Sequence, residues 1–115
     1  MRALRVAVTC LSLVATTPVL AGVADGTWAC SDAKGKALGV LALTDTSYTF
    51  TRPDGTAAEG GTIYYQGKDP AFVVEKGGLQ TELTAIGAIL DKDASGPVLY
   101  IAVEHGLPVQ CAPQK

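Results

Sequence analysis

Two cysteines, Cys30 and Cys111, stand near the two ends of the chain once its apolar N-terminus is set aside. In an oxidising compartment such a pair is most simply a disulfide rather than two free thiols. The bridge closes a loop of about 80 residues, which the chain-entropy model makes worth roughly 4 kcal/mol. It also requires the two Cα atoms to lie within about 7 Å of each other. The first and last segments of the domain must therefore be neighbours, as they are in a closed or nearly closed β-sheet.

The N-terminus has the layout of a secretory signal peptide. Arg2 and Arg5 form a positive region, an uncharged apolar stretch follows, and small residues allow cleavage after Ala21 or Ala24. The alternative is a membrane anchor, but the apolar run is marginal for a span of roughly 20 residues. We therefore interpret residues 1–24 as a signal peptide and expect the protein to be secreted or periplasmic.

Residues 25–115 are few enough to form a single β domain, and Cys10 leaves with the leader. The whole chain has 9 basic and 11 acidic side chains and a formal net charge of −2, and loss of the leader makes the remainder more acidic. An acidic domain repels phosphate backbones, so we expect no nucleic-acid partner. No basic amphipathic helix is evident in the pattern, so we expect no membrane association after cleavage.

Short apolar runs separated by turn signals predict an all-β fold. Turns recur at roughly the eight- to twelve-residue spacing of sandwiches and barrels. We expect a small antiparallel β-barrel or rolled sheet of seven to eight strands. The expected strands are 26–32, 37–43, 47–52, 61–66, 71–75, one starting at Leu79, 98–104 and 107–112.

Alternation of apolar and polar residues predicts which side chains face the core. Trp28 and Cys30 share one face of the first strand, and Leu107 and Cys111 share one face of the last. If these strands pair with the two cysteines opposite each other, Trp28 lies near Pro113.

Two segments do not fit the pattern cleanly. Residues 79–93 fit either a strand or a helical stripe, and Gly87 costs a helix about 1 kcal/mol relative to alanine. We favour a strand to about Ala85 and a second extended piece after Gly87. Pro108 cannot donate a ladder hydrogen bond, so it predicts an edge or bulge in the last strand and argues against full closure.

Strand geometry and turn signals also predict the environment of Tyr64, Tyr65 and Arg52. Tyr64 and Tyr65 point to opposite faces of a strand, so one belongs to the core and the other is an exposed aromatic. Arg52, beside the turn signal at 53–55, is interpreted as a solvated strand end.

One motif resembles a calcium-binding loop. Asp91, Asp93, Ser95 and Gly96 occupy the D-x-D-x-S-G spacing that lets alternate oxygens converge on a hard cation. The bidentate glutamate needed at the twelfth position is replaced by Ala102. We therefore expect a solvated turn and no metal, with calcium as the alternative.

His105 is the only histidine of the chain. Catalysis through it would require a nucleophile and an orienting carboxylate, but no G-x-S-x-G elbow is present and both remaining thiols are assigned to the disulfide. The sequence "EHG" is typical of a hairpin tip. We expect no catalytic residue, no enzyme and no cofactor, with an enzyme using His105 or a carboxylate cluster as an alternative.

The sequence "GTW" at 26–28 resembles the G-x-W on the first strand of lipocalin-like barrels. The overall plan is also similar to that of small bacterial periplasmic inhibitor barrels: a signal peptide, a short β-barrel and one disulfide. The resemblance implies that the tryptophan closes one end of the barrel. The chain is much shorter than a full lipocalin, and such a small barrel is largely filled by its own side chains.

These observations predict a non-enzymatic binding or inhibitory module that contacts an extracytoplasmic protein. Loops on a rigid sheet commonly carry function, so turns 53–60 and 67–70 are the candidate contact loops. The alternative of a carrier for a small apolar ligand predicts a continuous cavity lined by Trp28, Phe50 and Phe72.

Overall fold

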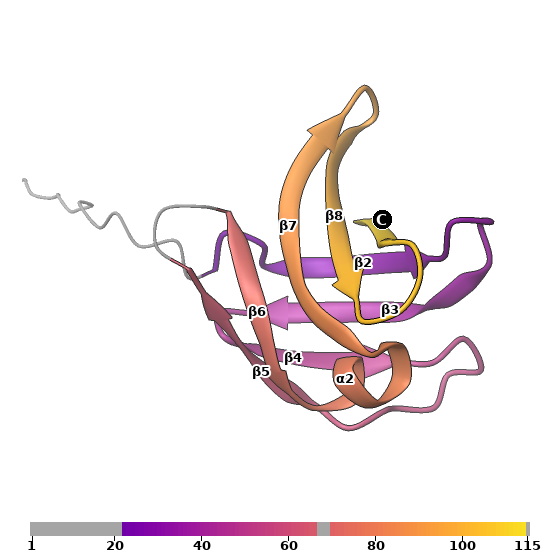
Figure 1. Ribbon diagram of the computed structural model, residues 1–115, viewed down its shortest axis with the longest axis vertical. Helices are drawn as coiled ribbons and strands as arrows, with labels where there is room; N and C mark the ends of the chain where they lie inside the picture. The colour runs from indigo at the N-terminus through magenta and orange to yellow at the C-terminus, as the bar shows by residue number, and fades with distance from the viewer. Residues whose placement is uncertain (1–21, 67–69, 115) are drawn as a thin grey trace, which may run out of the picture.

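The computed structural model describes residues 22–66 and 70–114, so the expected signal peptide lies almost entirely outside the described residues. Eight antiparallel strands form one closed barrel in chain order, and a short helix, α2, separates β6 from β7 (Figure 1). The all-β prediction is confirmed, and the barrel is closed. The elements are β2 (Gly26–Ser31), β3 (Ala37–Thr44), β4 (Ser47–Thr51), β5 (Gly61–Tyr65), β6 (Ala71–Lys76), α2 (Gly78–Leu83), β7 (Ala85–Asp93), β8 (Gly96–Val103) and β9 (Val109–Pro113).

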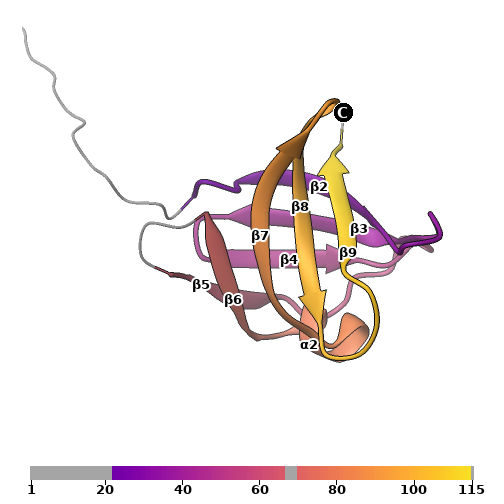
Figure 2. The ribbon, with the colours of Figure 1, turned by 45° about the horizontal axis from the view of Figure 1, so that its top comes forward.

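The disulfide joins the first and last strands, as the sequence predicted. Cys30 on β2 lies directly opposite Cys111 on β9, with 3.9 Å between their Cα atoms and a bond between their sulfur atoms. The same register places Trp28 opposite Pro113. Figure 2 shows β9 running alongside β8 toward β2, which closes the sheet on itself.

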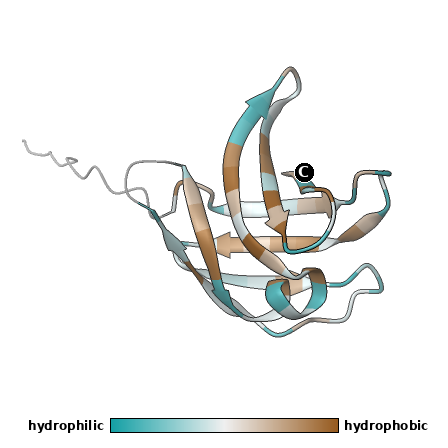
Figure 3. Cartoon of the chain, viewed as in Figure 1, coloured by the Kyte–Doolittle hydropathy of each residue, from teal (hydrophilic) through white to brown (hydrophobic). Residues whose placement is uncertain are grey.

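The barrel interior is a continuous apolar core. Alternate residues of each strand point inward, and Phe50, Leu41 and Ile101 are at most 1% exposed. Figure 3 shows apolar segments along β3, β6 and β7, and polar segments at α2 and the tip of the β7–β8 hairpin. Within the described residues, no helix has the length and apolar character needed to cross a membrane.

The expected strand from Leu79 to about Ala85 is wrong, because residues Gly78–Leu83 form helix α2. Leu79 is fully buried in the core, and Thr84 takes a left-handed conformation with φ of 55° that ends the helix. β7 then begins at Ala85. The extended segment expected after Gly87 is confirmed as part of β7. The helical interpretation, which rests on the spacing of Leu79 and Leu83, is therefore the correct one for the first half of this segment.

The expectations for the start of the last strand are also corrected. β9 begins at Val109, so Pro108 precedes the strand and its missing N–H removes no ladder bond. The proline is therefore compatible with closure. Leu107, expected on the core face, lies in the preceding loop and is 71% exposed.

Two glycine pairs, Gly60–Gly61 and Gly77–Gly78, bring two segments together beside Tyr48, and Gly61 and Gly77 lie against its hydroxyl. Tyr48 Oη donates a hydrogen bond to the Lys76 carbonyl at 2.8 Å and accepts one from the Leu79 N–H at 3.1 Å. A Cβ on Gly61 would collide with the Lys76 carbonyl, and one on Gly77 would lie 2.5 Å from Tyr48 Oη. The absence of side chains therefore lets the entry to β5 pack directly against the start of α2.

Candidate binding face

The aromatic residues expected to line a ligand cavity are packed into the core. Trp28, Phe50 and Phe72 are 5%, 1% and 3% exposed and belong to one continuous buried cluster. The Trp28 indole N–H donates a hydrogen bond to the Ala24 carbonyl at 2.9 Å. The protein's own side chains therefore occupy the interior, and the candidate binding site lies on the outer surface.

The outer surface of β5 to β8 carries exposed apolar residues in adjacent register. Tyr64 pairs with Val73 on β6, and Ile89 pairs with Tyr100 on β8. Tyr64 is 60% exposed, Ile89 56% and Ile86 53%, so these three apolar side chains lie outside the core. Together with the half-buried Val73 and Tyr100, they form a surface that we call the β5–β8 face. The expectation that one of the two adjacent tyrosines is exposed is confirmed.

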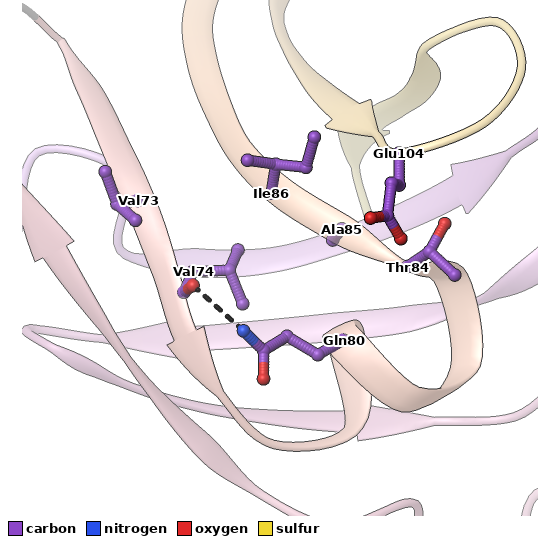
Figure 4. A pocket seen from close by; sticks show the side chains of 7 residues that line it. All are labelled: Val73, Val74, Gln80, Thr84, Ala85, Ile86 and Glu104. Atoms are coloured by element: carbon purple, nitrogen blue, oxygen red, sulfur yellow. Dashed lines mark hydrogen bonds between the residues drawn. The ribbon is translucent and has the colours of Figure 1, made fainter.

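A cleft of about 300 Å³ opens in the β5–β8 face where β6 and β7 separate. The two strands pair only between Ala71–Val73 and Gly87–Ile89, and α2 lies beside the remainder of β6. Figure 4 shows the side chains around the cleft, which come from β6, α2, β7 and the residues that directly follow α2 and β8. The lining residues are Val73, Val74, Gln80, Thr84, Ala85, Ile86 and Glu104.

Along the cleft, the edge of β6 is not paired with β7. Beyond Val73, the ladder to β7 has ended, although β6 continues to Lys76 and still pairs with β5. The Val74 carbonyl accepts a hydrogen bond from the Gln80 side-chain amide at 3.4 Å (Figure 4). In a complete ladder, a backbone N–H of the neighbouring strand would donate to the Val74 carbonyl. Here the Gln80 side chain takes that place, with a long hydrogen bond.

Carboxylates surround the apolar part of this face. Strand alternation places Glu75 and Asp91 on the outward side of β6 and β7, and Glu104 lines the cleft. Glu104 lies 4.0 Å from the ring of His105. Among the described residues, no lysine or arginine comes within 4.0 Å of the Glu75 or Asp91 carboxylate. The face therefore combines apolar side chains with two carboxylates, Glu75 and Asp91, that no described lysine or arginine pairs.

Arg52 lies directly after β4 with a side chain that is 38% exposed, as the sequence suggested, and it also pairs with a carboxylate. Its guanidinium donates to both carboxylate oxygens of Glu82 on α2, at 3.1 and 2.9 Å, and also to the Ala57 carbonyl at 3.1 Å. These hydrogen bonds hold the pKa of Glu82 below its usual value. The pair tethers α2 to the loop after β4 and so helps to position Gln80 beside the cleft. Sequence analysis missed it because the partners are 30 residues apart.

The calcium-like motif forms the tight turn between β7 and β8. Asp93 Oδ1 accepts hydrogen bonds from the Ser95 hydroxyl at 2.7 Å and the Ser95 N–H at 2.8 Å, which lower the pKa of Asp93. Asp91 Oδ1 accepts a hydrogen bond from the Lys92 N–H at 2.8 Å. In the part of the chain that the structure describes, no group of three or more His, Cys, Asp or Glu side chains is arranged to hold a metal ion. The motif thus shapes a hairpin.

The remaining sequence candidates lie apart from the cleft. The side chain of His105 is 85% exposed in the loop before β9 and does not line the cleft. The turn within 53–60 is held by Asp54, whose carboxylate accepts hydrogen bonds from the Thr56 hydroxyl and N–H. Of the other candidate contact loop, 67–70, residues 67–69 lie outside the described part of the chain.

No protein-family model, curated protein sequence or solved structure matches this chain. The closed eight-stranded antiparallel barrel is consistent with the plan of a lipocalin-like barrel.

Proposed function

We propose that the protein is an exported, non-enzymatic binding module that docks onto a basic extracytoplasmic protein through the β5–β8 face. The observation that carries this proposal is the combination of exposed Tyr64, Ile86 and Ile89 with the carboxylates around them. Exposed apolar patches with polar rims are typical of protein-interaction sites. The negative rim favours a positively charged partner and speeds the encounter with it.

The part of β6 that does not pair with β7 supports a particular mode of docking. An extended segment of the partner can enter the cleft beside β6 at Val74, whose carbonyl is not bonded to β7. Its apolar side chains would contact Val73 and Ile86, and a basic side chain would reach Glu104. The Gln80 amide would give up its long bond to the Val74 carbonyl in this mode.

The two other functional classes have less support. A carrier needs internal space, whereas the aromatic residues at the expected cavity are packed into the core. An enzyme needs converging acid, base or nucleophile groups, whereas His105 is exposed outside the cleft. The resemblance to periplasmic inhibitor barrels agrees with a binding role, and inhibition would be one outcome of such docking.

Affinity capture with purified, oxidised protein tests this proposal. The bait is incubated with the exported proteins of a bacterial host and washed at increasing salt. We expect it to retain a basic protein, with binding weakened about tenfold or more by Ile89→Ser. Leu107→Ser is the matched control, because Leu107 is also an exposed apolar residue but lies in the loop before β9.

Salt and charge variants complete this test. Glu104→Gln should weaken retention and its salt dependence, whereas Glu59→Gln, on the β4–β5 loop, should leave both unchanged. Retention that is insensitive to Ile89→Ser and to Glu104→Gln would contradict the proposed face. Release of a stoichiometric small molecule from the bait, with no retained protein, would favour the carrier instead.

A further inference from the structure

Ala24 belongs to the folded domain, although the sequence allows the leader to end after it. Its side chain is 1% exposed and is part of the core cluster. Its carbonyl accepts the hydrogen bond of the Trp28 indole at 2.9 Å, and its N–H donates to the Tyr65 hydroxyl at 3.3 Å. The Gly22 carbonyl in turn accepts a hydrogen bond from the Asp25 N–H at 3.0 Å. Residues 22–25 thus form a turn that is hydrogen-bonded to Trp28 and Tyr65.

Cleavage after Ala24 would remove this turn. The buried Trp28 N–H would lose its acceptor, and a buried donor without a partner is costly. The new α-amino group would be placed on Asp25, whose carboxylate accepts a hydrogen bond from the Asp45 N–H at 2.7 Å. That bond supports the turn between β3 and β4, where Asp45 has a φ of 58°. Cleavage after Ala21 leaves all of these contacts in place.

We infer that the exported protein is matured by hydrolysis of the bond between Ala21 and Gly22, so that the folded protein begins at Gly22. A leader peptidase that reads small residues would recognise Val19 and Ala21 at the third and first positions before the cut. Water adds across the peptide bond, leaving a carboxylate on Ala21 and an amino group on Gly22. The inference rests on the proposed export but not on the proposed partner.

The exported product itself tests this inference. The full chain is produced in a bacterial host with a periplasm, and the periplasmic protein is analysed by intact mass and N-terminal sequencing. We expect the product to begin at Gly22. A product that begins at Asp25 would overturn the inference about the site while preserving export. An uncut chain that stays in the cytoplasm would overturn both, and neither result depends on whether a partner is found.

A conservative variant tests the role of Ala24 independently of the cut. Tyr65→Phe in the exported protein removes the hydroxyl that accepts the Ala24 N–H, and Tyr64→Phe removes an exposed hydroxyl from the neighbouring residue. We expect Tyr65→Phe to lower the folding equilibrium constant roughly three- to tenfold, and Tyr64→Phe to leave it nearly unchanged. Equal stability of the two variants would contradict the place of Ala24 in the fold.

Discussion

At the scale of single residues, the Tyr48 hydroxyl is the best-defined polar feature of the interior. It serves as donor to one backbone carbonyl and as acceptor for one backbone N–H, at a point where four glycines bring two segments together. Burial raises the pKa of Tyr48, which keeps the hydroxyl protonated and able to donate over a wide pH range.

Tyr48→Phe should therefore destabilise the protein by about 1–3 kcal/mol, because it leaves the buried Leu79 N–H without an acceptor. The free energy of unfolding from urea titration measures this loss. Tyr64→Phe is the control, since Tyr64 is 60% exposed. Equal stabilities of the two variants would show that the hydrogen bonds of Tyr48 contribute nothing.

Gly77→Ala should cost more than Gly35→Ala. Both residues have a positive φ, of 115° and 87°, so each substitution carries a backbone penalty of roughly 1–2 kcal/mol. Only at position 77 would the new Cβ also press on Tyr48 Oη and the Gly60 carbonyl, which adds about 1–3 kcal/mol of overpacking. Similar unfolding free energies for the two variants would contradict the tight packing around Tyr48.

Single-residue predictions from the sequence succeeded where a local pattern decides the outcome. The alternation of strand residues correctly separated Tyr64 from Tyr65, and it placed both cysteines toward the core. It could not reveal that Arg52 pairs with Glu82, because only the fold brings them together. It also placed Leu107 inside, although the strand begins two residues later.

At the scale of elements, helix α2 creates the opening in the outer face. It contacts both β6 and β7 where the two strands no longer pair, and its Gln80 side chain bonds the Val74 carbonyl of β6. The sequence of this segment fits two periodicities, and a β context favoured the strand. The structure resolved the ambiguity because a helical turn buries Leu79 in the core while returning the chain to begin β7.

The tether of α2 should depend on pH. The pKa of Glu82 is lowered in the folded protein by the Arg52 hydrogen bonds, so the tether contributes stability above the usual Glu pKa of 4.5 and loses it as pH falls through the lowered pKa. We expect a slightly higher melting temperature for the wild type than for Glu82→Gln at about pH 7, with the difference vanishing at about pH 2. A difference that persists unchanged in acid would contradict this role of the ion pair.

At the scale of the whole molecule, the disulfide and the closed sheet both require the first and last strands to be neighbours. The pairing of β2 with β9 closes the barrel, and the disulfide fixes the two strands at one register position. The sequence predicted the bridge and the adjacent ends, because the distance limits of a disulfide require them, but it left closure of the sheet open because Pro108 argued against it. The position of the cleft was not predictable, since it depends on how far β6 and β7 pair.

Loss of the bridge should be costly. The cysteines are separated by 81 residues, and the Cys30→Ala, Cys111→Ala double variant should lose about 2–5 kcal/mol of stability. Urea unfolding of the variant beside the oxidised protein measures the loss. An unchanged unfolding free energy would mean that the pairing of β2 and β9 alone is sufficient to close the barrel.

The central claim is that the β5–β8 face is the surface that meets a partner. Photo-crosslinking tests it most directly, with a photoreactive residue placed at Ile89 or, as a control, at Thr49, an exposed position on β4. Illumination of exporting cells should give a discrete adduct with a basic protein from position 89 and none from position 49. An adduct formed only at position 49, or no adduct at position 89, would contradict the account.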